Sequence, residues 1–161
     1  MDGFRASEDL KARVDDFYVR YVETICDGNI AAWPDFFTEV CLYRVTQRSN
    51  QERGMLLGPM FAETRGGLID RVVAIQNALV FQPRALCYVI GSIRIIERTV
   101  DAIKARSMFS AYHTLEGADT ELLMVGRTFD TLVFDGEALK FAERVVVFDT
   151  ERTPGALIYP I

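Results

Sequence analysis

The spacing of apolar residues changes once along this chain, and that change limits the folds open to it. In the first third, apolar residues recur at intervals of three and four, which is typical of amphipathic helices. After Ala85 nearly all of the sequence has the pattern of long strands joined by tight turns. Helices followed by strands predict an α+β fold, with helices packed on a strongly curved, mostly antiparallel sheet.

Three helices are predicted. Ser7 is the expected N-cap of a long helix that ends at Gly28, where a left-handed cap suits glycine. A short second helix around Trp33 contains Pro34 and should be bent or partly 3₁₀. The third helix is expected to begin after Gly66-Gly67 and to end before Pro83. The apolar face of the first helix consists of Leu10, Val14, Phe17, Tyr18, Tyr21 and Ile25.

Five strands are predicted, the first over residues 40–45 and the others over 85–98, 102–115, 120–134 and 139–149. Residues 46–66 are polar and rich in glycine, and we expect them to form a connection. Asp135-Gly136 is a strong hairpin signal, and Gly91 and Gly126 inside strands predict bulges. The residues expected to be largely buried are Leu10, Val14, Trp33, Phe36, Leu68, Val72, Ile75, Phe109, Val125 and Val147.

Length and composition predict one domain over residues 1–161, large enough for its own core. The formal net charge of −5 argues against binding to nucleic acid or an anionic membrane. No apolar segment approaches membrane-spanning length. Cys26, Cys41 and Cys87 are widely spaced, each in an apolar run, and we interpret them as reduced core residues of a cytoplasmic protein.

A set of short strings stands in a particular order along the chain: Asp16-Phe17-Tyr18, Trp33-Pro34-Asp35-Phe36-Phe37-Thr38-Glu39, Asp70-Arg71-Val72, Gly126-Arg127-Thr128-Phe129-Asp130-Thr131-Leu132 and Phe141-Ala142-Glu143-Arg144-Val145-Val146-Val147-Phe148-Asp149. As a set they resemble the small (beta) subunits of Rieske-type aromatic-ring-hydroxylating dioxygenases, which have the NTF2-like (cystatin-like) cone fold. The apolar ending, residues 157–161, is most similar to the salicylate and anthranilate hydroxylase branch. The chain departs from the family at Tyr88 and Ser92, where His and Asn are frequent.

The resemblance implies a bacterial, cytoplasmic, non-catalytic structural subunit of a multicomponent oxygenase used in the catabolism of aromatic compounds. It implies a large (alpha) partner subunit, typically in an α₃β₃ complex. That partner would carry the Rieske [2Fe–2S] cluster and the mononuclear non-haem Fe(II), and this chain would carry no cofactor. The chain would thus belong to an oxidoreductase whose active site lies on the alpha subunit.

The residues themselves agree with this division of labour. A Rieske centre needs two histidines and a mononuclear iron needs two more, while this chain contains only His113. We therefore assign no catalytic residue and no metal ligand here.

The alternative is a stand-alone enzyme of the same fold (an isomerase, dehydratase or hydrolase) or a ligand-binding protein. Its candidate pocket residues are His113, Asp130, Arg127, Tyr18 and Tyr43. Strand alternation places His113 on an apolar face, where a general base could lie. A lone histidine among apolar neighbours is more often a core residue with one hydrogen bond. Asp130 near Arg127 is, in the same way, first interpreted as an ion pair on a strand face.

Two apolar segments predict self-association, as a trimer, or assembly with the large subunit. Contiguous exposed apolar surface usually marks a contact site, so we expect one of the segments at a subunit boundary. The other possibility is that both fold back onto the chain's own core. The candidate interface residues are Met55, Leu56, Leu57, Met60 and Phe61 in the first segment, and Leu157, Ile158, Tyr159 and Ile161 in the second.

Overall fold

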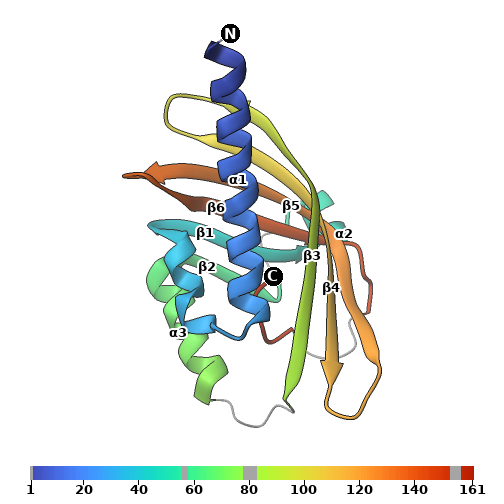
Figure 1. Cartoon of the computed structure of the whole chain (residues 1–161). Helices are drawn as coiled ribbons and strands as arrows, with labels where there is room; N and C mark the ends of the chain where they lie inside the picture. Colours follow the sequence, from blue (N-terminus) through green and yellow to red (C-terminus); the bar gives the residue numbers. More distant parts are fainter. Residues whose placement is uncertain (1, 56–57, 78–82, 153–156) are drawn as a thin grey trace.

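A long helix lies across the concave side of one strongly curved sheet (Figure 1). The computed structural model describes residues 2–55, 58–77, 83–152 and 157–161. The helix, α1 (Asp2–Cys26), buries one face of Leu10, Val14, Phe17, Tyr21 and Ile25, spaced three to four residues apart. It therefore packs as its apolar period predicts.

Helix α1 begins earlier than predicted. Its first residue is Asp2, so Ser7 lies inside the helix instead of capping it. Residues such as Arg5 and Ala6 have high helix propensity and extend the helix by more than a turn. The other end is as expected: Gly28 has φ +77°, and its N–H donates to the Ile25 carbonyl at 3.1 Å.

The second helix is 3₁₀ over its whole length, as Pro34 suggested. This element, η1 (Ile30–Phe36), buries Ile30, Trp33 and Pro34. It leads directly into β1 (Phe37–Gln47), which is longer than the predicted strand over residues 40–45. Helix α3 (Arg65–Asn77) begins earlier than predicted, because Gly66 and Gly67 lie inside its first turn, and it buries Leu68 and Val72.

Two elements lie in the stretch that was predicted to be a connection. Helix α2 (Arg48–Glu52) is one short turn, and β2 (Met60–Thr64) is a five-residue edge strand. Neither is long enough to give a periodic pattern in the sequence. The other strands agree closely with the prediction: β3 (Arg84–Arg98), β4 (Ile103–Leu115), β5 (Thr120–Asp135) and β6 (Ala138–Phe148).

The six strands form one sheet in the order β2-β1-β6-β5-β4-β3. Strands β1 and β6 are parallel, and every other neighbouring pair is antiparallel. The predicted irregularity near Gly91 is present as a register shift between Gly91 and Arg94, with Ser92 at φ +53°. These features confirm an α+β fold with a curved, mostly antiparallel sheet.

Gly126 has a different role from the predicted bulge. The register of β5 with both of its neighbours is regular at this residue. A Cβ atom there would lie 2.2 Å from the Val147 carbonyl oxygen and 2.7 Å from the Phe148 Cα. Glycine is required at this position because the backbone of β6 comes so close.

The core lies between α1, η1 and the concave face of the sheet. It contains a cluster of aromatic rings with centroid distances from 4.8 to 6.5 Å. Of the predicted core residues, Phe36, Ile75 and Val125 are only partly buried, and the others are buried. The interpretation of all three cysteines as core residues is wrong for Cys87, which is exposed on β3; Cys41 is buried and Cys26 is intermediate.

Candidate functional site

A buried ion pair lies on the concave face of the sheet, where β5 and β6 are neighbours. Asp130 and Arg144 are register partners, and Arg144 Nη1 donates to Asp130 Oδ2 at 2.8 Å. Neither side chain has any exposed surface. The same Oδ2 accepts a hydrogen bond from the Tyr18 hydroxyl at 2.5 Å and one from Thr128 Oγ1 at 2.7 Å.

Burial and charge act in opposite directions on this pair. Burial raises the pKa of the Asp130 carboxyl above its ordinary value, while the charge of Arg144 and the donors Tyr18 and Thr128 lower it. Burial lowers the pKa of Arg144, but the combined effect of Asp130 and the neighbouring tyrosines is larger and raises it overall. Burial also raises the pKa of the Tyr18 hydroxyl well above 10. Three donors hold Asp130 Oδ2, and Oδ1 is buried without a partner among the described atoms, so Asp130 is a structural acceptor that is closed off from a substrate.

The end of the cone beyond this pair is filled by residues 157–161, which we call the tail segment. The main-chain oxygen of Ile161 accepts hydrogen bonds from the Tyr21 hydroxyl at 2.9 Å, the Tyr43 hydroxyl at 3.2 Å and Arg144 Nε at 3.3 Å. The Ile161 N–H donates back to the Tyr43 hydroxyl at 2.9 Å. In Figure 1 the C mark lies beside the last turn of α1, inside the curve of the sheet.

Two further side chains hold the tail segment. The Tyr88 hydroxyl on β3 donates to the Pro160 carbonyl at 2.8 Å. Arg71 Nη2 on α3 donates to the carbonyls of Leu157 and Ile158, at 3.0 and 3.1 Å. Tyr88, one of the family departures seen in the sequence, therefore contributes directly to closing the cone.

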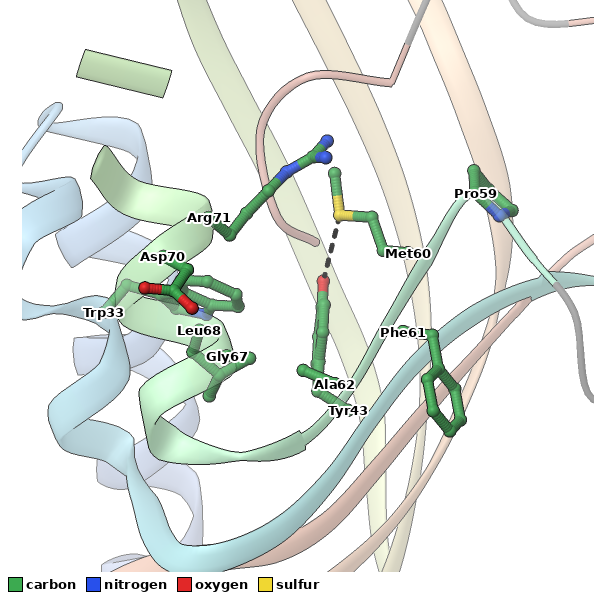
Figure 2. A pocket seen from close by; sticks show the side chains of 10 residues that line it. All are labelled: Trp33, Tyr43, Pro59, Met60, Phe61, Ala62, Gly67, Leu68, Asp70 and Arg71. Atoms are coloured by element: carbon green, nitrogen blue, oxygen red, sulfur yellow. Dashed lines mark hydrogen bonds between the residues drawn. The ribbon is translucent and has the colours of Figure 1, made fainter. Parts of the chain in front are cut away.

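A surface pocket of about 360 Å³ lies next to the tail segment, between η1, β2 and α3. Figure 2 shows Tyr43 in its wall, with the hydroxyl directed toward the Met60 sulfur at 4.0 Å. Arg71 extends over the same pocket (Figure 2). Its lining includes Trp33, Tyr43, Met60, Phe61, Leu68 and Arg71.

The structure brings together three of the five candidate pocket residues. Tyr18, Tyr43 and Asp130 all lie inside the cone. Arg127 does not join them: it is exposed on the opposite face of the sheet, and Asp130 is paired with Arg144. The predicted pairing of Asp130 with Arg127 is therefore wrong, because strand residues three apart point to opposite faces.

His113 is buried near the far end of β4, where it is the cross-strand partner of Glu121. Its Nε2 lies 3.1 Å from Glu121 Oε2, and its Nδ1 is buried with no partner among the atoms that the structure describes. This matches the expected core histidine with one hydrogen bond.

The sequence reasoning missed Arg144 and Tyr21 as parts of the buried polar network. Tyr21 was expected in the core, but its hydroxyl was given no partner. Arg144 could not be predicted because β6 contains a bulge. Thr131 pairs with Glu143 but Leu132 pairs with Phe141, so β6 has one extra residue there. Strict alternation from Phe141 would place Arg144 on the outer face.

The candidate interface residues fall into three groups. Met55 and Phe61 are 44% and 50% exposed, while Met60 is buried. Leu56 and Leu57 lie outside the described residues. In the tail segment Ile158 and Ile161 are buried, and Leu157 and Tyr159 are partly buried against the chain's own core.

Two features relevant to function are absent from the described residues. No group of three or more histidine, cysteine, aspartate or glutamate side chains there is arranged to hold a metal ion. Within the same residues, none of the helices is long and apolar enough to cross a membrane.

A family model and several relatives over nearly the full length of this chain belong to ring-hydroxylating oxygenases. The family model described as "Ring hydroxylating beta subunit" matches residues 22–154. The anthranilate 1,2-dioxygenase small subunit of Burkholderia cepacia is 24% identical over 157 residues, or 96% of this chain and 98% of that protein. Subunit beta 1 of the terminal oxygenase component of terephthalate 1,2-dioxygenase from Comamonas sp. is 26% identical over 145 residues, covering 90% and 94%.

A solved structure gives the same result. The beta subunit of a proposed aromatic-ring-hydroxylating dioxygenase from Novosphingobium aromaticivorans superposes with a TM-score of 0.88 at 26% identity, covering 97% of this chain and 99% of that one. This similarity confirms the NTF2-like fold that the sequence predicted. Together with the family match over most of its length, it identifies the chain as a member of the ring-hydroxylating beta subunit family.

Proposed function

We propose that this chain is the non-catalytic small subunit of a multicomponent aromatic-ring-hydroxylating oxygenase. Its family membership and its similarity to two dioxygenase small subunits support this role. The main structural support for the proposal is that the cone is filled. The tail segment occupies it, and the only buried carboxylate on its floor, among the described residues, is already bound by Arg144, Tyr18 and Thr128.

The same observation argues against a pocket enzyme of this fold. Such an enzyme needs an acid or base that a substrate can reach. Tyr18, Tyr43 and Asp130 are each hydrogen-bonded within the chain, and His113 lies elsewhere, against Glu121. Among the described atoms, Asp130 Oδ1 and His113 Nδ1 have no partner, but both are buried where a substrate does not reach them.

The proposed partner is a large (alpha) subunit in an α₃β₃ complex in the bacterial cytoplasm. That subunit would carry a Rieske [2Fe–2S] cluster and a mononuclear Fe(II), for which this chain, with one histidine, lacks the ligands. The relatives are named for anthranilate and terephthalate, which are aromatic carboxylates. We therefore propose an aromatic carboxylate as the substrate of the complex.

The proposed contact surface centres on Phe61, on edge strand β2. Its side chain is half exposed, and an exposed apolar side chain on a sheet edge is typical of a contact site. Met55 lies in the same stretch and is also exposed. The tail segment, which is mostly buried in its own chain, would contribute mainly through Tyr159 and Leu157.

Co-expression with a ring-hydroxylating large subunit from the same genome tests the proposal. We expect the two chains to purify together, with a mass by light scattering that corresponds to α₃β₃. Phe61→Asp should weaken this assembly, because it places a charge in an apolar contact. Val100→Asp is the matched control, since Val100 is 99% exposed in a turn remote from β2.

Two results would contradict the proposal. One is a stable large subunit that never binds this chain. The other is turnover of an aromatic substrate by this chain alone. If the complex stays intact with Phe61→Asp, the contact surface lies elsewhere on this chain, and the proposed accessory role is unaffected.

A further inference from the structure

Two of the free cysteines lie close together, where the end of α1 meets β3. Cys26 is the last residue of α1, and Cys87 lies on β3. The Tyr88 N–H donates to the Cys26 sulfur at 3.3 Å. This hydrogen bond places the Cys26 thiol against the backbone of β3, at the residue that directly follows Cys87.

Bond geometry limits the distance between these two cysteines. The Tyr88 nitrogen is bonded to the Cys87 carbonyl carbon and lies roughly 2.4 Å from the Cys87 Cα. The Cys26 sulfur is therefore within about 6 Å of that Cα. The Cys87 sulfur is two bonds from the same Cα, and rotation about the Cα–Cβ bond of this exposed side chain changes its distance to Cys26.

A disulfide needs the two Cα atoms roughly 4.4–6.8 Å apart. Cys26 is followed directly by the turn at Gly28, so it lies at a helix end, where local opening costs less free energy than in the centre of an element. The small adjustment that a bridge requires therefore falls on a part of the fold that can move without disturbing the sheet.

The two thiols differ in exposure. Cys87 is exposed on an edge strand, while Cys26 is partly buried and packs against the core. Burial raises the pKa of the Cys26 thiol, the Tyr88 N–H lowers it, and the neighbouring Cys87 raises it further. An oxidant in solution therefore reaches Cys87 first and finds Cys26 beside it as a second thiol.

We propose that Cys26 and Cys87 are a redox-sensitive modification site, which forms an intramolecular disulfide when the chain meets a hydroperoxide. In a reducing compartment such a bridge is transient and reports on oxidation. The bridge ties the end of α1 to β3, next to Tyr88, whose hydroxyl holds the tail segment through Pro160. This site is additional to the accessory role and does not depend on the large subunit.

The reaction has two steps. The Cys87 thiolate attacks one oxygen of hydrogen peroxide, the O–O bond breaks and hydroxide leaves, which gives a sulfenic acid. The Cys26 sulfur then attacks the Cys87 sulfur, the S–O bond breaks, and the hydroxyl leaves as water with the proton of the Cys26 thiol. Two thiols lose two electrons in total, and one peroxide is reduced to two waters.

Mass spectrometry of the full, folded chain tests the proposal. The chain is reduced, freed of reductant, treated with hydrogen peroxide and then alkylated in denaturant. We expect a pair of peptides joined through Cys26 and Cys87 in monomeric chain, which dithiothreitol separates. The Cys87 thiol should disappear at least about tenfold faster than that of buried Cys41, because the reactivity of a thiol depends on its exposure.

Three variants define the two roles. Cys26→Ser should stop the reaction at the sulfenic acid of Cys87, which dimedone traps. Cys87→Ser should abolish the bridge and leave Cys26 reduced. Cys41→Ser is the matched control and should form the bridge as wild type does, because Cys41 is on β1 and three strands separate β1 from β3 in the sheet.

Two results overturn the proposal. One is a chain with a native circular dichroism spectrum in which Cys87 is oxidised while Cys26 stays a free thiol. The other is a disulfide that joins Cys87 of two chains, seen as a dimer on a non-reducing gel, with no bridge inside the monomer.

Discussion

Raising the pH above 10 should unfold this protein cooperatively, because four tyrosine hydroxyls are buried in the cone. Burial raises the pKa of Tyr18, Tyr21, Tyr43 and Tyr88 above the ordinary value. A group whose pKa is raised by folding stabilises the native state fully below its unfolded pKa. That stabilisation is lost as the pH rises above the unfolded pKa, which is near 10 for tyrosine.

The size of the effect follows from the number of buried hydroxyls. At pH 11 ionisation stabilises the unfolded chain by about 1.4 kcal/mol for each tyrosine that stays neutral in the native state, or about 5–6 kcal/mol for four. Small proteins have unfolding free energies of about 5–15 kcal/mol, so this loss is large enough to unfold many of them.

Tyrosinate absorbance and circular dichroism, followed together during an alkaline titration, measure this effect. We expect most of the tyrosinate signal to appear in the same narrow pH interval in which the circular dichroism signal is lost. Tyr88→Phe should reduce the pH dependence of the unfolding free energy above pH 10 by about a quarter. The reasoning is refuted if all six tyrosines ionise gradually near pH 10 while the circular dichroism spectrum stays native.

Two more predictions concern stability. Arg144→Met should lower the free energy of unfolding in urea by about 3–5 kcal/mol, because Asp130 is then buried without its counter-ion. Adding Asp130→Leu should recover much of that loss, and a double variant no more stable than the single one would contradict this account. Gly126→Ala should cost about 1–3 kcal/mol in thermal melts, since its Cβ would lie 2.2 Å from the Val147 carbonyl oxygen. The matched Gly91→Ala, with no atom within 4 Å, should change stability by less than about 0.5 kcal/mol, and equal losses in both variants would argue against close backbone packing at Gly126.

The long elements of this fold could be predicted because their patterns are long. Strands β3 to β6 each have eleven or more residues, and turn signals such as Asp135-Gly136 mark their ends. Helix α2 and strand β2 have five residues each, too few for a period to appear. Elements of this size are determined by tertiary contacts rather than by local sequence.

The buried polar network could be predicted only in part. Tyr18, Tyr43 and Asp130 were among the candidate pocket residues and do lie in the cone, although Asp130 was first interpreted as an ion-pair partner of Arg127. The partner of Asp130 could not be found from strand alternation. The bulge in β6 shifts the alternation by one residue and turns Arg144 inward, and a bulge leaves no clear mark in the sequence Phe141-Ala142-Glu143-Arg144.

The tail segment shows a different limit. Its apolar residues were expected to cover either a subunit boundary or the chain's own core, and composition cannot separate the two. In the structure it lies within the cone, where side chains from α1, β1, β3 and β6 bind its main chain. Contacts so distant in sequence depend on the complete sheet. Its place in an assembled complex remains a prediction.

Turnover by the reconstituted complex tests the central claim, that this chain supports the reaction without taking part in its chemistry. The complex is assembled with wild-type chain, with His113→Ala or with Tyr18→Phe, and hydroxylation is measured at equal occupancy of the large subunit. We predict rates within a few-fold of wild type for both variants. A loss of about 10³ or more, the scale expected when a catalytic acid or base is removed, would contradict the account and place the chemistry in this chain.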